Sequence, residues 1–215
     1  MVDAREKLRA AKPEDRMTVF AVLMRLREIC CDPRLVADNW TGSSAKLDAC
    51  LELVTEAVAG GHRILLFSQF TSMLELLAKR LDEAGVSHFT LQGSTPKPVR
   101  AEQVRRFNQG EADVFLISLR AGGTGLNLTA ADIVIHYDPW WNLAAQNQAT
   151  DRAYRIGQRN PVQVYRLIAQ DTIEEKIVEL QQAKQSLADT VTGGADGAIL
   201  SMNPEQLLQL LGEEA

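Results

Sequence analysis

Two arginines three positions apart, Arg152 and Arg155, have the spacing in this chain that most suggests chemistry. They lie in the stretch QATDRAYRIGQ, with Gln148 one turn before Arg152. On a helix, residues three or four positions apart share a face, so the amide and both guanidiniums would project together. Guanidinium forks suit phosphate and neutralise the charge that develops in phosphoryl transfer. The pattern predicts a site facing a triphosphate. Surface salt bridges are the alternative for an isolated Arg-x-x-Arg.

A glycine-rich stretch, LRAGGTGLNLT, follows the apolar run DVFLIS. Gly122, Gly123 and Gly125 allow backbone amides to approach a phosphate closely, and Ser118 and Arg120 add donors. The stretch is neither a Walker A loop, because no Gly-Lys-Ser/Thr follows, nor a dinucleotide fingerprint, because leucine occupies the third glycine position. A phosphate-binding loop is therefore one interpretation, and a flexible loop between two buried strands is the other.

Two more apolar runs end in residues that suit nucleic acid. RILLFS is followed by Gln69, Phe70 and Thr71, and here the hydroxyl of Ser68, an amide and the start of a helix would hold a phosphodiester. A helix cap is the alternative. DIVIHYD runs into PWWN, whose adjacent tryptophans predict one buried ring and one ring presented to a sugar or base.

Short apolar runs rich in β-branched residues predict the strands that position these loops. Alternation with helical stretches predicts an α/β fold, a parallel sheet flanked by helices, whose working loops lie beyond the carboxyl ends of the strands. The predicted strands are 63–68, 88–91, 113–118, 132–138 and 162–169, and the predicted helices are 17–31, 46–61, 71–84, 97–108, 143–155 and 172–190.

Composition sets limits on function. The 215 residues carry a net charge of −5, which excludes a surface that is basic all over but leaves room for a local basic groove. Cys30, Cys31 and Cys50 form neither a disulfide framework nor a zinc spacing, so we expect packing roles and no metal site. The amino terminus lacks an apolar region. A soluble intracellular protein is expected, cytoplasmic or nucleoid-associated in a bacterium and nuclear in a eukaryote.

Four stretches together resemble one known family. RLREICCDPRLV, ILLFSQFTSML, FLISLRAGGTGLNLTAADIVIHYDPWWN and QATDRAYRIGQ look like motifs of the carboxyl-terminal motor lobe of Swi/Snf-type ATPases, in helicase superfamily two. The resemblance extends over about residues 17–190 and implies a RecA-like lobe of P-loop NTPase type with amphipathic helices at both ends. The implied divisions are a helical segment and linker at 1–45, the RecA-like lobe at 46–170, a brace-like helix at 171–191, and a flexible linker with a short helix at 192–215.

The resemblance also implies residue roles. Arg155 matches the arginine finger, with Arg152 and Gln148 beside it, facing ATP that a first lobe holds. Leu143, Tyr154 and Gln92 stand where the family commonly has proline, histidine and aspartate, which leaves the subfamily open. The matches on the nucleotide side are Gly123, Gly125, Asn127 and Asp151, and those on the DNA backbone are Ser68, Gln69, Phe70, Ser118, Arg120, Ala121, Gly122 and Trp140.

The sequence lacks a Walker A loop, and its Asp82-Glu83-Ala84 run ends a predicted helix instead of following a strand. ATP and Mg²⁺ are therefore expected mainly on a first lobe, and this chain alone forms no complete ATPase site. The expected partners are double-stranded DNA and the amino-terminal RecA-like lobe of the same protein, together with a DNA-bound protein or RNA polymerase. The chain alone is expected to be monomeric and away from membranes. Two alternatives stay open: a non-catalytic scaffold module and a stand-alone nucleotide or dinucleotide enzyme.

Overall fold

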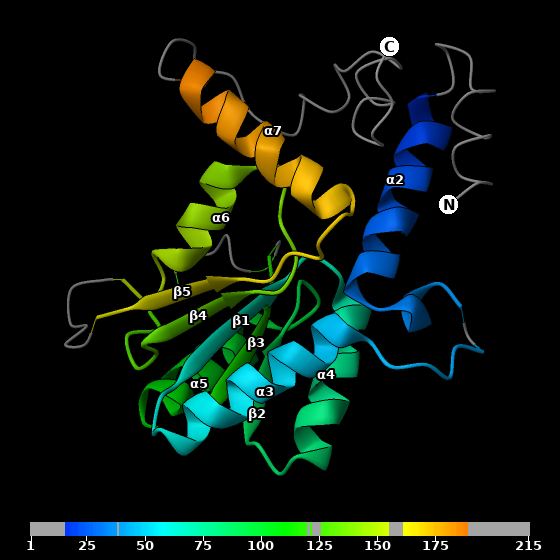
Figure 1. Ribbon diagram of the computed structural model, residues 1–215. Coiled ribbons are helices and arrows are strands. Elements are labelled where there is room, and N and C mark those ends of the chain that lie inside the picture. Colours follow the sequence, from blue (N-terminus) through cyan, green and yellow to red (C-terminus); the bar gives the residue numbers. More distant parts are fainter. Residues whose placement is uncertain (1–15, 38, 120, 122–125, 155–160, 189–215) are drawn as a thin grey trace. The chain divides into compact units, whose positions relative to one another are not determined.

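The computed structural model describes residues 16–37, 39–119, 121, 126–154 and 161–188 (Figure 1). The described chain alternates helices with short strands. Its helices are α2 (Arg16–Cys31), the 3-10 helix η1 (Pro33–Leu35), α3 (Ala45–Ala59), α4 (Thr71–Glu83), α5 (Lys97–Asn108), α6 (Leu143–Thr150) and α7 (Ile173–Ala188), and its strands are β1 (Ile64–Ser68), β2 (His88–Leu91), β3 (Val114–Ser118), β4 (Ile133–His136) and β5 (Gln163–Arg166).

The chain divides into two compact units. One spans residues 41–168, and the other combines residues 1–40 with 169–215. The domain limits expected from the sequence stay a prediction.

All five strands form one parallel sheet, which confirms the predicted fold class. The strand order is β2-β3-β1-β4-β5, with β1 in the middle. Ile64 at the start of β1 is the register partner of Val114 on one side and of Ile133 on the other. The three central strands are buried along their whole length, as continuous apolar runs in a parallel sheet require.

The side chains of β1 alternate between two layers of core. Leu65 and Phe67 belong to the same cluster as Phe107 of α5 and Ala149 of α6. The intervening residues point to the opposite face, and α3 and α4, which both contact β1, lie in front of the sheet in Figure 1. The sheet is therefore sandwiched between helices, which leaves its carboxyl edge as the place for a site.

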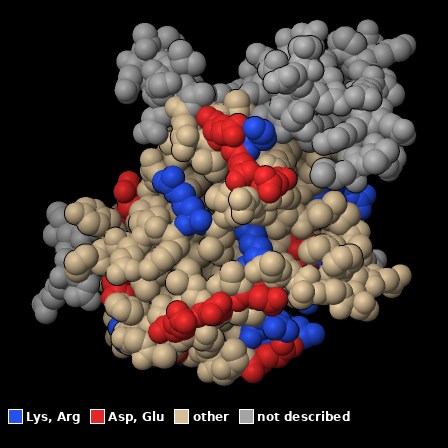
Figure 2. All heavy atoms as spheres, in the orientation of Figure 1, with Lys and Arg blue, Asp and Glu red and all other residues tan. Residues whose placement is uncertain are grey.

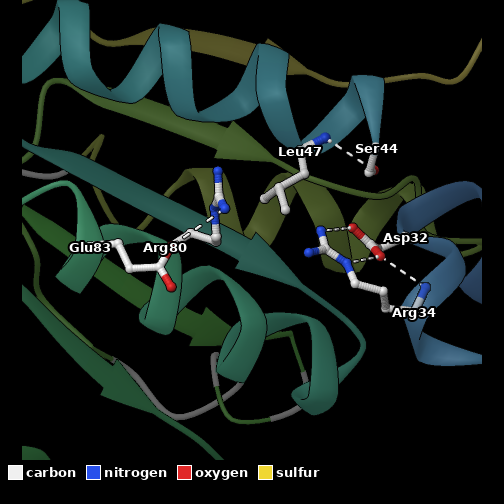
Figure 3. Close-up of polar contacts among 6 residues, drawn as sticks. All are labelled: Asp32, Arg34, Ser44, Leu47, Arg80 and Glu83. Atoms are coloured by element: carbon white, nitrogen blue, oxygen red, sulfur yellow. Dashed lines mark hydrogen bonds and ion pairs between the residues drawn. The ribbon is translucent and has the colours of Figure 1, made fainter. Parts of the chain in front are cut away.

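Local sequence explains how α3 begins and how the turn before β3 closes. Ser44 is the N-cap of α3, and its Oγ accepts a hydrogen bond from the Leu47 amide at 3.4 Å (Figure 3). Gly110 has a φ of 86°, and a Cβ at this position would collide with the Arg63 guanidinium. The positive φ therefore favours glycine at residue 110, and a larger residue would also displace the end of the Arg63 side chain.

In the second unit, α2 and α7 contact each other. α2 ends at Cys31, and the next residue, Asp32, caps η1 by accepting from the backbone amide of Arg34 at 2.9 Å. The guanidinium of Arg34 also binds both oxygens of Asp32, at 2.8 and 2.7 Å, as Figure 3 shows. Such a bidentate pair fixes the turn in the predicted motif RLREICCDPRLV.

Charge is mixed on the surface. Figure 2 shows acidic and basic side chains together on one face, with an acidic band across its lower part. α3 exposes Asp48, Glu52 and Glu56 at four-residue spacing, so its outer face offers no cationic surface to phosphate. Among the described residues, no helix is long and apolar enough to cross a membrane.

Candidate functional site

The carboxyl ends of the three central strands meet at one edge of the sheet. β1 ends at Ser68, β3 at Ser118 and β4 at His136. Ser68 and Ser118 are register partners, and Phe67 is the partner of His136. The loops that follow these strands therefore start side by side, at the edge where open α/β sheets place their ligands.

Ser68 is a junction between these loops. Its carbonyl oxygen accepts a hydrogen bond from the Leu119 amide at 3.0 Å, which attaches the loop after β3. Its hydroxyl donates to Oδ1 of Asp138 at 2.5 Å, which attaches the loop after β4. The same hydroxyl oxygen accepts from the Phe70 amide at 3.2 Å, within the loop after β1. One buried residue thus bonds to all three segments.

Asp138 completes this junction and is a residue that sequence reasoning did not single out. Only 1% of it is exposed. The backbone amide of Gln69 lies 3.3 and 3.4 Å from its two carboxylate oxygens. The available signal was an acidic residue placed directly between a buried strand and a proline, in DIVIHYDP.

The structure places Ser68 and Phe70 among the buried residues of this edge. The Ser68 hydroxyl is fully buried and serves Asp138 and the local turn, which is close to the alternative of a cap, and the Phe70 ring is also buried. Gln69 is half-buried, and its Nε2 makes no hydrogen bond among the described residues. This nitrogen is itself buried, and contact of all three residues with DNA stays a prediction.

The described part of the loop after β3 is held by a residue that the sequence did not indicate. Ser118 is buried, and its Oγ accepts from the Ala121 amide at 3.3 Å. The carbonyl oxygen of Ala121 accepts from Nη1 of Arg100, on α5, at 3.3 Å. Arg100 therefore ties α5 to this loop. The predicted residues Arg120, Gly122, Gly123 and Gly125 lie outside the described residues.

The two tryptophans differ from the expectation of one buried and one presented ring. Trp140 and Trp141 are both half-buried. Trp140 packs against the core cluster of the α5 and α6 face, and its backbone amide donates to Oε1 of Gln146 at 3.2 Å. The packing and the bond to the buried Gln146 hold Trp140 in place, so Trp140 partly covers the edge of the core.

Helix α6 carries the first residue of the predicted triphosphate site. Asn142 is its N-cap, and its Oδ1 accepts from the Ala145 amide at 3.0 Å. Gln148 is exposed on this helix. The helix ends at Thr150 and does not extend to residue 155 as predicted.

The end of α6 changes the position of Arg152. This residue lies in the turn after the helix, and only 3% of it is exposed. The expected face shared by Gln148 and Arg152 is therefore wrong, because the helical repeat stops between them. The Leu128 amide donates to the carbonyl oxygen of Arg152 at 3.2 Å, and Ala153 is in the core. Arg155 lies outside the described residues.

His136 connects the end of β4 to the end of α6. Its Nε2 lies 2.9 Å from Oγ1 of Thr150, and its ring stacks on Phe67 with a centroid separation of 5.5 Å. Burial, with a smaller contribution from the charge of Arg166, lowers the pKa of His136 to about 4. The ring is therefore neutral at pH 7 and acts as a fixed polar link between strand and helix.

The two remaining predicted residues on the nucleotide side are exposed. Asp151 follows the last turn of α6, and Asn127 precedes Leu128. The carbonyl oxygen of Asn127 accepts from Nδ2 of Asn108 at 2.8 Å, and Oδ1 of Asn108 accepts from the Ala130 amide at 3.3 Å. The side chain of Asn108, the last residue of α5, thus binds the segment before β4 at two points. Its place in the sequence did not reveal this role.

Groups that were assigned no chemistry have structural roles. α4 ends at Glu83 and is followed by Gly85 with a φ of 69°, so the Asp82-Glu83-Ala84 run is a helix terminus, as predicted. Burial raises the pKa of the Cys50 thiol to about 12, which fits a packing role. In the part of the chain that the structure describes, no three His, Cys, Asp or Glu residues gather as a metal site.

Comparison with known proteins identifies close relatives. The model of the helicase conserved C-terminal domain matches residues 45–157. The putative ATP-dependent helicase/translocase YwqA of Bacillus subtilis is 40% identical over 198 residues, which are 89% of this chain and 21% of that protein. An uncharacterized ATP-dependent helicase of Mycoplasma pneumoniae is 37% identical over 206 residues, 95% of this chain and 20% of its own length. The chain thus spans about a fifth of these curated relatives.

Solved structures agree in fold. The SWI2/SNF2 ATPase C-terminal domain of Sulfolobus solfataricus superposes with a TM-score of 0.76 at 27% identity, over 96% of this chain and 86% of that one. The SWI2/SNF2 ATPase core of the same organism in complex with double-stranded DNA gives a TM-score of 0.78 at 28% identity, over 99% of this chain and 47% of that one.

Proposed function

Because the chain belongs to the helicase conserved C-terminal domain family, as the carboxyl-terminal lobe of a Swi/Snf-type ATPase, we propose that it is the second motor lobe of a DNA-dependent ATPase and translocase. In this proposal ATP and Mg²⁺ bind mainly to an amino-terminal RecA-like lobe of the same protein. Closure of the two lobes brings cationic groups of this chain to the triphosphate, and hydrolysis releases them. Each cycle shifts the grip of this lobe on the DNA backbone.

The observation that carries the proposal is the convergence of motif segments at the carboxyl edge of the sheet. The loops after β1, β3 and β4 are hydrogen-bonded through Ser68, and the segment before β4 is bonded to Arg152 through Leu128. His136 and Thr150, 2.9 Å apart, join the end of α6 to the strand that leads to Asp138, and this contact links the proposed nucleotide side to the loops proposed for DNA. The relative whose structure was solved with double-stranded DNA supports DNA as the substrate.

Burial limits the role of Arg152. Arg152 is held inside the lobe, so we assign it to shaping the turn after α6 and assign the arginine finger to Arg155. Gln148 and Asp151 are exposed and are proposed to face the nucleotide, together with Asn127, Gly123 and Gly125. The DNA backbone is proposed to meet Gln69, Trp140 and the loop from Ser118 to Gly122, with Ser68 and Phe70 beneath them.

The test is hydrolysis by the full-length protein with Arg155→Ala. Supplying an arginine finger is worth about 10³ to 10⁵ in rate, so this variant should lose DNA-stimulated turnover by about a thousandfold or more while binding ATP normally. Arg105→Ala, which removes an exposed arginine of α5, is the control and should hydrolyse ATP as the wild type does. Turnover of Arg155→Ala within a few-fold of wild type would contradict the assignment.

Hydrolysis and nucleotide binding distinguish the two alternatives. A scaffold module predicts no DNA-stimulated hydrolysis by the wild-type protein. A stand-alone nucleotide enzyme predicts tight nucleotide binding by residues 1–215 alone, whereas a second motor lobe predicts weak binding until the first lobe is present.

A further inference from the structure

The carboxylate of Asp138 lies at the carboxyl edge of the sheet but cannot serve the DNA backbone directly. It is almost wholly buried, and a negative charge repels a phosphodiester. A buried carboxylate is costly unless hydrogen bonds compensate it, and the Ser68 hydroxyl and the Gln69 amide provide such bonds. Both donors belong to the segment that the proposed function places against DNA.

We propose that Asp138 is a positioning residue for DNA engagement: it holds the loops after β1 and β4 to each other through Ser68 and Gln69. This inference rests on the proposed function and adds to it a residue that makes no DNA contact of its own. The bond from Ser68 to Asp138 spans 70 positions in the sequence, so it joins two segments that no local turn would hold together.

The junction requires, at residue 138, a side chain that accepts hydrogen bonds and donates none. Ser68 donates at 2.5 Å, and the Gln69 amide is directed at both oxygens of the carboxylate. An ionised carboxylate accepts both bonds, whereas an asparagine offers one oxygen and turns two N–H donors toward the remaining donor. Asp138→Asn therefore keeps the volume of the side chain but breaks part of the junction.

The loop after β3 is attached to the same point. The Leu119 amide bonds to the Ser68 carbonyl oxygen at 3.0 Å, and the Tyr137 amide bonds to the Phe67 carbonyl oxygen at 2.9 Å. These backbone bonds continue the sheet to its edge and survive a change at Asp138. Asp138→Asn should thus loosen Gln69 and Phe70 more than Leu119.

The chain contains a matched control at the opposite edge of the sheet. Ser87, just before β2, donates from its hydroxyl to Oδ2 of Asp113, just before β3, at 2.6 Å. Asp113→Asn changes the same kind of serine–aspartate bond at the amino edge, away from the proposed DNA loops. Asp113→Asn therefore controls for the loss of a serine–aspartate bond as such, whereas a loss of folded protein would lower the rate at saturating DNA without raising the DNA concentration for half-maximal stimulation.

The experiment measures ATP hydrolysis by the full-length protein as the DNA concentration is varied. A lost hydrogen bond to a charged group corresponds to about tenfold in an equilibrium constant. Asp138→Asn should therefore raise the DNA concentration for half-maximal stimulation about tenfold, while the rate at saturating DNA falls less than twofold. Asp113→Asn should match wild type in both quantities.

A second measurement keeps the inference testable if Asp138→Asn proves unstable. In Ser68→Ala, hydrogen exchange of the Gln69 and Phe70 amides should quicken at least several-fold, and DNA should be required at higher concentration. An unchanged half-maximal DNA concentration in both variants, or an equal shift in Asp113→Asn, would overturn the inference and leave the proposed function intact. A wild-type protein without DNA stimulation would instead overturn the proposed function, and this inference with it.

Discussion

The backbone amide of Leu128 donates to the carbonyl oxygen of Arg152 at 3.2 Å, which joins the end of the glycine-rich motif to the arginine motif. The two segments are 24 positions apart in sequence, and the strand β4 and helix α6 lie between them. A main-chain bond does not depend on the side chain of either residue. The side chain of Arg152, which is almost wholly buried, makes a separate contribution.

Replacing Arg152 should destabilise the lobe and should also slow ATP hydrolysis by the full-length protein. Truncation of a large buried side chain costs about 2–4 kcal/mol, so Arg152→Ala should lower the free energy of unfolding of the 215-residue chain by about that amount. Gln148→Ala, on the exposed surface of α6, should change it by less than about 0.5 kcal/mol. Denaturant titration gives both values. Equal stability of the two variants would show that the buried position of Arg152 contributes nothing.

Stability should fall in mild acid because of His136. Its pKa is about 4 in the folded chain, whereas an unfolded histidine has a pKa of about 6.5. Between these values the unfolded state binds a proton that the folded state does not. The full contribution of the neutral His136 to the free energy of unfolding is therefore present above pH 6.5. About 2 kcal/mol of this contribution is lost by pH 5.

The check is to compare unfolding of wild type and His136→Gln from pH 7.5 to 4.5. The difference in free energy between the two chains should shrink as the pH falls, because only wild type takes up the histidine proton on unfolding. A pH-independent difference would contradict the prediction.

Arg100 should matter to DNA engagement because it holds the loop after β3. Arg100→Ala removes the bond to the Ala121 carbonyl oxygen and should raise the DNA concentration for half-maximal stimulation about three- to tenfold. Arg105→Ala, on the same helix, loses exposed contacts with Glu102 and Gln109 and should match wild type. If the two variants behave alike, the loop does not depend on Arg100.

DNA binding should depend on salt and not on sequence. Contacts to phosphate release counterions, and a protein that neutralises about two to four phosphates loses at least about tenfold in affinity between roughly 50 and 200 mM salt. Titrations with two duplexes of unrelated sequence should give the same slope. A constant affinity across this range would argue against backbone contact.

The sheet could be predicted from the sequence because its strands are dense in apolar, β-branched residues. Runs such as ILLFS and VFLIS are buried at every position, and glycine or polar turns separate them from amphipathic helices. Such signals lie within a few neighbouring residues. The predicted limits of the first three strands were within one residue of the observed ones, whereas the last two strands were predicted two and three residues too long at their carboxyl ends.

The site was only partly predictable. The loops were located by the rule that ligands meet the carboxyl ends of parallel strands. The burial of Arg152 was missed because helical spacing was continued beyond Thr150, where the helix stops. Asp138 and Arg100 were missed because their partners are 70 and 21 positions away, and only the fold brings them together.

The central position of β1 has a consequence for synthesis. β1 pairs on one side with β4, which emerges from the ribosome about 70 residues later. At roughly 5 to 20 residues per second, that delay is about 4 to 14 seconds. Throughout it, five consecutive core residues of the nascent chain have an open strand edge. Binding of chaperones to the nascent chain should therefore be greatest before β4 has been synthesised.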